Sequence, residues 1–166
     1  MILFHGSNMS ISDVDLSKCR PFKDFGRGFY LTDIESQATH MAKRVARIYG
    51  GTPVVSKFVF DKGIYDDATI TTMIFDKPSR DWALFILNNR NRESAYDTNP
   101  LCNQDNKYDM VFGAVANDDL AYLFRTFKSG LIDIDSLARG LEYKILTNQY
   151  SFHTENALKY LKPLEG

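Results

Sequence analysis

Three short segments carry side chains whose types suit the binding of a flat, polar ligand. They are residues 4–7 (FHGS), 26–33 (GRGFYLTD) and 148–152 (NQYSF). His5 and Gln149 can donate or accept hydrogen bonds. The face of Tyr30 can stack on a flat cationic ring for about 0.5 to 2 kcal/mol, and Gly6 lets a ligand approach the backbone closely. Residues of these types predict ligand binding more directly than catalysis.

Other kinds of site have little support in the sequence. The three histidines lack a metal-binding spacing such as HExxH. Cys19 and Cys102 are far apart, and neither stands in a CxxC or in a nucleophile motif with a paired histidine. No GxGxxG follows the first expected strand, and no GxxxxGK[ST] occurs. A nucleotide site, if present, is therefore of another kind, and no metal is expected.

Taken together, the three segments resemble the catalytic core of the diphtheria-toxin and poly(ADP-ribose) polymerase class of ADP-ribosyltransferases. Residues 26–33 are similar to the G-K-G-[IV]-Y-F-[AS] segment of that class, and residues 148–152 stand where the family often carries N-E-Y. In the family's His-Tyr-Glu triad, the segments supply His5, Tyr30 and, in the Glu position, Gln149. The match looks closest to a bacterial branch of the fold.

The resemblance implies that NAD⁺ is the co-substrate and assigns residues to it. The backbone of Gly6 would hold the nicotinamide carboxamide, with a further contact from Ser7. Tyr30 would stack on the nicotinamide ring, and His5 would hydrogen-bond a hydroxyl of the adenosine ribose. Gly28 is also expected among the NAD⁺-binding residues.

The expected catalytic residues are Gln149, Tyr30 and His5, and Gln149 departs from the family pattern. A glutamate there meets the positive charge that develops on the ribose as the glycosidic bond breaks. At about 4 to 5 Å and an effective dielectric of about 20, the missing Coulomb energy is roughly 3 to 4 kcal/mol. Members of the resembled class that transfer a single ADP-ribose often lack this glutamate, so the resemblance implies transfer of one ADP-ribose and no chain elongation. The candidates for a compensating carboxylate are Glu155, Asp109 and Glu142.

Each segment also has a purely structural interpretation. Residues 5–7 can form an ordinary turn, and residues 26–31 a glycine-rich hairpin with a core tyrosine. Gln149 can face solvent from an edge strand. The three segments together favour the site.

Periodicity and turn residues predict the elements that position these segments. The expected strands are residues 2–5, 28–32, 53–60, 108–116 and, as the last strand, 143–153. The expected helices are residues 34–48, 79–89, 118–128, 134–139 and 156–161. Thr32 and Glu35 form a capping-box pattern before the first helix, and Gly50 follows its end. The polar stretch 88–107 is expected to be a long loop.

The order of these elements favours an α+β fold over a doubly wound sheet. The resemblance implies an ADP-ribosyltransferase-like fold with two packed, mainly antiparallel sheets and flanking helices. The 166 residues suit a single domain, and the hydrophobic content of 44% is that of a globular protein. A net charge of −1 gives no general attraction to nucleic acid.

The functional expectation is a mono-ADP-ribosyltransferase that acts on a protein or nucleic-acid target. By analogy alone it is a bacterial toxin or effector, with an antitoxin as partner. The alternatives are a non-catalytic module that binds NAD⁺, ADP-ribose or a protein, and an NAD⁺ glycohydrolase. The apolar start lacks a basic region, and no apolar run reaches the roughly 18 residues of a membrane span. We therefore expect a cytoplasmic protein with no membrane partner.

Overall fold

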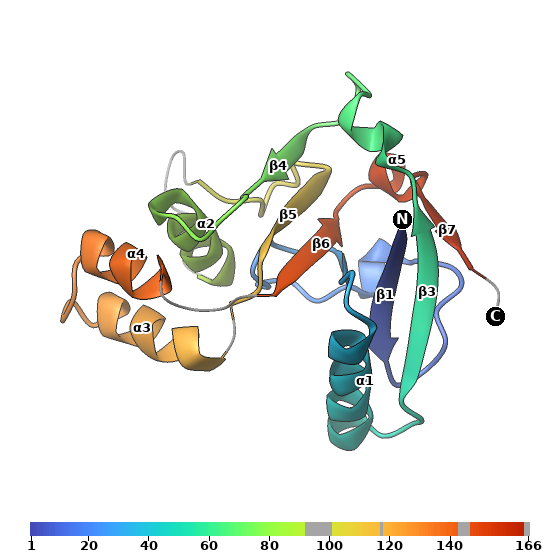
Figure 1. The fold of residues 1–166 in the computed structure, drawn as a ribbon, viewed down its shortest axis with the longest axis horizontal. Helices are drawn as coiled ribbons and strands as arrows, with labels where there is room; N and C mark the ends of the chain where they lie inside the picture. Colours follow the sequence, from blue (N-terminus) through green and yellow to red (C-terminus); the bar gives the residue numbers. More distant parts are fainter. Residues whose placement is uncertain (92–100, 117, 143–146, 165–166) are drawn as a thin grey trace.

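The computed structural model describes residues 1–91, 101–116, 118–142 and 147–164 (Figure 1). Its strands are β1 (Ile2–Ser7), β2 (Phe29–Leu31), β3 (Val54–Phe60), β4 (Thr72–Ile74), β5 (Met110–Ala114), β6 (Asn148–Phe152) and β7 (Leu161–Pro163). Its α-helices are α1 (Glu35–Tyr49), α2 (Arg80–Arg90), α3 (Asp118–Lys128), α4 (Ile134–Glu142) and α5 (Glu155–Leu158). The expected α+β class, with two mainly antiparallel sheets, is confirmed.

The first sheet has the order β1-β3-β7, and all of its neighbours are antiparallel. Helix α1 lies against β1 and β3 (Figure 1). The packing depends on Gly6, since a Cβ added there would lie 2.0 Å from the carbonyl oxygen of Ala38. Successive side chains of a strand point to opposite faces. Gly6 therefore faces α1, and its neighbour His5 faces the second sheet.

The second sheet has the order β2-β6-β5-β4, with β4 parallel to β5 and the other pairs antiparallel. Strand β6 is central, so Gln149 does not lie on an edge strand. The interpretation of Gln149 as a solvent-facing edge residue is therefore wrong.

An apolar core joins the two sheets. It takes buried side chains from every strand except β4. Its main members are Leu3, Phe29, Leu31, Phe58, Phe60, Met110, Tyr150, Phe152 and Leu161. The sheets therefore pack face to face through this cluster.

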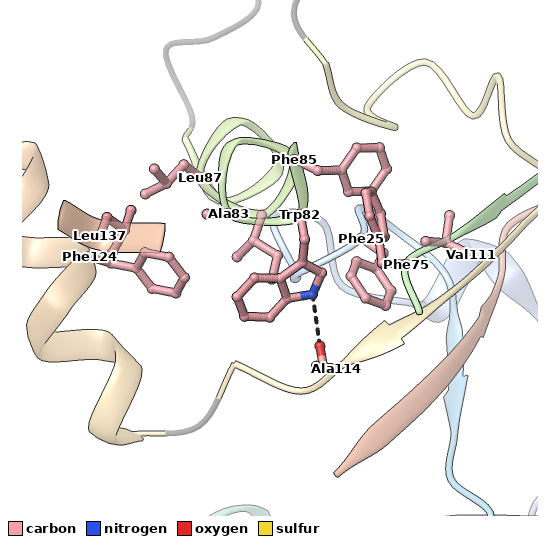
Figure 2. Close-up of a cluster of buried hydrophobic side chains, with 11 residues drawn as sticks. Phe25, Phe75, Trp82, Ala83, Phe85, Leu87, Val111, Ala114, Phe124 and Leu137 are labelled. Carbon is pink, nitrogen blue, oxygen red and sulfur yellow. Dashed lines mark hydrogen bonds between the residues drawn. The ribbon is translucent and has the colours of Figure 1, made fainter. Parts of the chain in front are cut away.

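The opposite face of the second sheet packs against α2, with α3 and α4 outside it. Figure 2 shows the buried cluster, in which the indole nitrogen of Trp82 donates to the carbonyl of Ala114 at 3.2 Å. The inner face of α2 carries Trp82, Phe85, Ile86 and Asn89, which are fully buried. Phe25, from the connector before β2, also lies in this cluster.

The start of α1 differs from the capping-box prediction. The N-cap is Ile34, without a side-chain bond, and α1 begins at Glu35. Thr32 instead accepts from the Ile34 N–H at 3.2 Å and donates to the Gln37 side chain at 2.8 Å. Thr32 is not available as a cap because its backbone pairs with Phe4 of β1. The predicted end of α1 at Gly50, where φ is 77°, is confirmed.

The end of the chain also differs from the prediction. Strand β6 is not the last strand, because α5 ends at Leu158 and β7 follows where a longer helix was expected. Thr154 caps α5, accepting from the Ala157 N–H at 3.3 Å. Pro163 is tolerated in β7 because that strand lies at the sheet edge.

Two parts of the middle of the chain need separate comment. The short strand β4 was not predicted, since three residues give too little pattern. Within the expected loop 88–107, residues 92–100 lie outside the described residues, as do 143–146 of the expected last strand.

Candidate functional site

Tyr30 projects from β2 toward α2 and is fixed through its hydroxyl. The hydroxyl donates to the carbonyl of Gly26 at 2.7 Å and accepts from the N–H of Phe25 at 3.0 Å. The Phe25 ring stacks beside it, with centroids 6.4 Å apart. Burial, and then the charge of Asp24, raise the pKa of Tyr30 well above its usual range. The side chain is thus a neutral, partly exposed aromatic surface held in one orientation.

His5 connects β1 to β2. Its Nδ1 lies 2.7 Å from the carbonyl oxygen of Tyr30, and its ring packs on Phe29 at 4.4 Å. Burial lowers the pKa of His5, against the opposing effect of the Tyr30 bond, so the ring is neutral at pH 7. Because the carbonyl can only accept, Nδ1 carries the proton and Nε2 is an acceptor.

The backbone of Gly6 points into the space beside β2. Phe4 exchanges both backbone hydrogen bonds with Thr32, at 2.8 and 3.0 Å. Residues of an antiparallel strand direct these groups to alternate sides. Gly6, two residues later, therefore directs its N–H and C=O away from β3 and toward β2. A backbone donor and acceptor side by side in this way suit an amide ligand.

Gln149 contacts a carboxylate that the sequence did not indicate. Its side-chain nitrogen donates to Asp24 Oδ2 at 3.0 Å. Asp24 also accepts from Arg90 Nε at 2.8 Å, Arg90 Nη2 at 2.5 Å and the N–H of Ala116 at 3.2 Å. The side chain of Asp24 is only 12% exposed. A partly buried ion pair, with the Arg90 side chain 34% exposed, therefore lies directly behind Gln149.

Within the described part of the chain, none of the predicted compensating carboxylates contacts the Gln149 side chain. Asp109 accepts from the Thr154 hydroxyl at 2.6 Å and from the Thr71 N–H at 2.7 Å, which ties β5 to α5 and β4. Glu155 is exposed in the first turn of α5. The side chain of Glu142 lies outside the described residues. Asp24 is the carboxylate that contacts Gln149.

Gly28 and Ser7 lie at the margins of this region. A Cβ on Gly28 would lie 2.6 Å from Nδ1 of His153, so the glycine allows that buried histidine to pack against β2. Ser7 ends β1, and its hydroxyl donates to the Asn8 side chain at 3.4 Å.

Three of the sequence-predicted residues are connected by direct contacts. His5 bonds Tyr30, and the segment 24–26 bonds both Tyr30 and Gln149. No buried polar side-chain atom in the described residues lacks a partner. His5 Nε2 and Gln149 Oε1 have no hydrogen-bond partner among the described residues, and both side chains are only partly buried, so these two atoms reach solvent. The corner consists of His5, Gly6, Tyr30, Gln149 and Asp24, and we call it the His5–Gln149 corner.

Comparison with known proteins gives a family. The chain belongs to the family described as "Protein of unknown function (DUF3990)", which matches residues 1–162. No curated protein and no solved structure matches the chain. No helix in the described ranges is long and apolar enough to cross a membrane.

Proposed function

We propose that this chain binds NAD⁺ at the His5–Gln149 corner and acts as a mono-ADP-ribosyltransferase that releases nicotinamide. The observation that carries the proposal is the convergence of three distant segments. His5 is 25 residues from Tyr30 in sequence, and Gln149 is 125 residues from Asp24. His5 bonds the backbone of Tyr30, and Gln149 bonds Asp24, which lies next to the Phe25 and Gly26 groups that hold the Tyr30 hydroxyl.

The binding roles follow from the atoms that are open. The N–H and C=O of Gly6 suit the carboxamide of nicotinamide, which needs one acceptor and one donor. The exposed part of Tyr30 suits the cationic ring, for about 0.5 to 2 kcal/mol. Nε2 of His5 can accept from a hydroxyl of the adenosine ribose. Ser7 and Gly28, at the margins of the corner, would contact the same ligand from outside these groups.

The proposed reaction breaks the bond between ribose C1′ and the nicotinamide nitrogen. Nicotinamide leaves with the bonding electron pair as a neutral molecule, and a nucleophile on the acceptor forms the new bond to C1′ and loses a proton. Positive charge on the ribose makes its 2′-hydroxyl a stronger donor as the bond breaks. Oε1 of Gln149 can accept that hydrogen bond, so the contact strengthens in the transition state.

The test is release of nicotinamide from NAD⁺ by the purified protein. Tyr30→Ala should lower kcat/KM by about 10- to 30-fold, which corresponds to the loss of about 1.4 to 2 kcal/mol of stacking. Tyr122→Ala is the matched control, because that tyrosine of α3 is 64% exposed and packs on nothing at the corner. The control should release nicotinamide at the wild-type rate.

Two further treatments in the same experiment identify the acceptor of ADP-ribose. Labelled NAD⁺ is incubated with the protein and a bacterial lysate, and the product is treated with protease or with nuclease. Label lost to one treatment assigns the acceptor to protein or to nucleic acid, and release without label transfer indicates hydrolysis. Binding of NAD⁺ without any release would replace the transferase with a non-catalytic module. No binding at all would refute the proposal.

A further inference from the structure

The carboxylate of Asp24 has all of its strong acceptor positions in use. Oδ1 takes the two Arg90 contacts, at 2.8 and 2.5 Å. Oδ2 takes the N–H of Ala116 at 3.2 Å and the side-chain amide of Gln149 at 3.0 Å. Asp24 is thus held by the end of α2 and by the residues after β5, independently of Gln149.

This arrangement fixes which way the amide of Gln149 points. A carboxylate can accept hydrogen bonds but cannot donate them, so only the NH₂ group of Gln149 can face Asp24. A flipped amide would place Oε1 against a carboxylate oxygen, where two acceptors repel. Oε1 therefore faces away from Asp24, and it reaches solvent because no buried polar atom is left without a partner.

We infer that Asp24 is a positioning residue that holds Gln149 with Oε1 toward the ribose and supplies the negative charge that glutamine lacks. The inference rests on the proposed function. The charge of Asp24 acts through one hydrogen bond, and polarisation along such a chain makes Oε1 a better acceptor. Arg90 offsets part of that charge and keeps the carboxylate in place.

The same geometry accounts for glutamine in a position where the resembled family has glutamate. A glutamate at 149 would put two carboxylates about 3 Å apart, and like charges at that distance do not both ionise readily. Asp24 and Gln149 together would do the work of one glutamate. The pair should therefore be exchangeable only as a unit.

A double-mutant cycle tests the unit, with Asp24→Asn, Gln149→Glu and the double variant. Asp24→Asn should lower kcat for nicotinamide release by about 10-fold with KM changed less than about threefold, since the amide can flip and the interaction acts in the transition state. Gln149→Glu should also fall below wild type, because Asp24 repels the new carboxylate. The double variant should exceed both single variants by about 10-fold, because the introduced asparagine can donate to the introduced glutamate.

Two controls accompany the cycle. Asp67→Asn makes the same chemical change at a carboxylate that accepts from Thr69 and Tyr160, and it should leave release unchanged. The free energy of unfolding in urea is measured for every variant, so that loss of folding is separated from loss of turnover. If Asp24→Asn does not fold, Gln149→Glu decides, since it keeps the Asp24–Arg90 pair intact.

The outcomes separate the inference from the proposed function. Additive effects on kcat, or release by Gln149→Glu above the wild-type rate, would overturn the inference. Coupling in unfolding but not in kcat would mean a purely structural contact, which also overturns it. If wild type neither binds nor cleaves NAD⁺, the proposed function fails and takes the catalytic part of the inference with it. The unfolding cycle then still reports whether Asp24 holds Gln149.

Discussion

Two desolvated histidines, His5 and His153, each make the same kind of hydrogen bond through Nδ1. They differ in what Nε2 contacts. Each directs Nδ1 to a backbone carbonyl at 2.7 Å, that of Tyr30 for His5 and that of Arg27 for His153. Burial lowers the pKa of both rings, for His153 to about 4, so both are neutral at pH 7. The two rings therefore start from the same protonation state and the same tautomer.

The second nitrogen distinguishes the two regions. Nε2 of His153 lies 2.8 Å from the hydroxyl of Ser151, and the residue is 4% exposed. Nε2 of His5 has no hydrogen-bond partner within the described residues and reaches solvent. A histidine with both ring nitrogens hydrogen-bonded inside the protein stabilises the fold. A histidine with a solvent-exposed acceptor nitrogen can also bind a ligand. The comparison predicts that His153 matters for stability and His5 for binding.

The largest effect should be on folding. His153→Ala should cost about 3 kcal/mol of unfolding free energy, because it leaves a cavity and removes the partners of Ser151 and the Arg27 carbonyl. His5→Ala should cost about 1 kcal/mol, since it removes one hydrogen bond at a partly open position. Urea unfolding measures both, with the exposed His40→Ala as a control. Equal losses at His5 and His153 would break the comparison.

The free energy of unfolding should also depend on pH through His153. His153 has a pKa of about 4 in the folded protein against an ordinary value of 6.5. Between these values the unfolded chain binds the proton more strongly, so stability is full above pH 6.5 and falls as the pH falls. The loss from pH 7 to pH 5 should be about 2 kcal/mol. His153→Gln should remove most of this slope in urea unfolding, and an unchanged slope would assign it to other groups.

Much of the fold could be predicted because the elements have strong patterns. Helix α2 shows why, since the apolar residues at helical spacing from Trp82 to Ile86 are those that the core buries. The end of the chain shows the limit. Residues 156–161 suit either a helix or a helix and a short strand, and pairing of Leu161 with Phe60 of β3 decides between them. Phe60 and Leu161 are far apart in the sequence, so their pairing leaves no local pattern.

Only the site residues that lie in segments with a local pattern could be predicted from the sequence. Tyr30 and His5 stand in segments with recognisable neighbours, whereas Asp24 stands in a polar connector with no periodicity. Its partner Arg90 is 66 residues away and appears in the sequence as the end of an ordinary helix. An ion pair between a connector and a helix end depends on tertiary packing. The sequence therefore indicated Asp109, Glu155 and Glu142 instead, of which Asp109 has a structural position and Glu155 an exposed one.

The smallest expected effect is the one that most directly tests the open nitrogen of His5. His5→Ala should weaken NAD⁺ binding by about 5- to 10-fold, the equivalent of one hydrogen bond of about 1 to 1.4 kcal/mol. Calorimetric titration of NAD⁺ measures it, and His40→Ala, on the exposed side of α1, should bind as wild type does. Since burial lowers the pKa of His5, wild-type affinity should fall with acid at a lower pH than for an ordinary histidine, because a protonated Nε2 cannot accept. Affinity unchanged in His5→Ala would mean that the open nitrogen faces solvent alone, and the distinction between the two histidines would then be one of burial only.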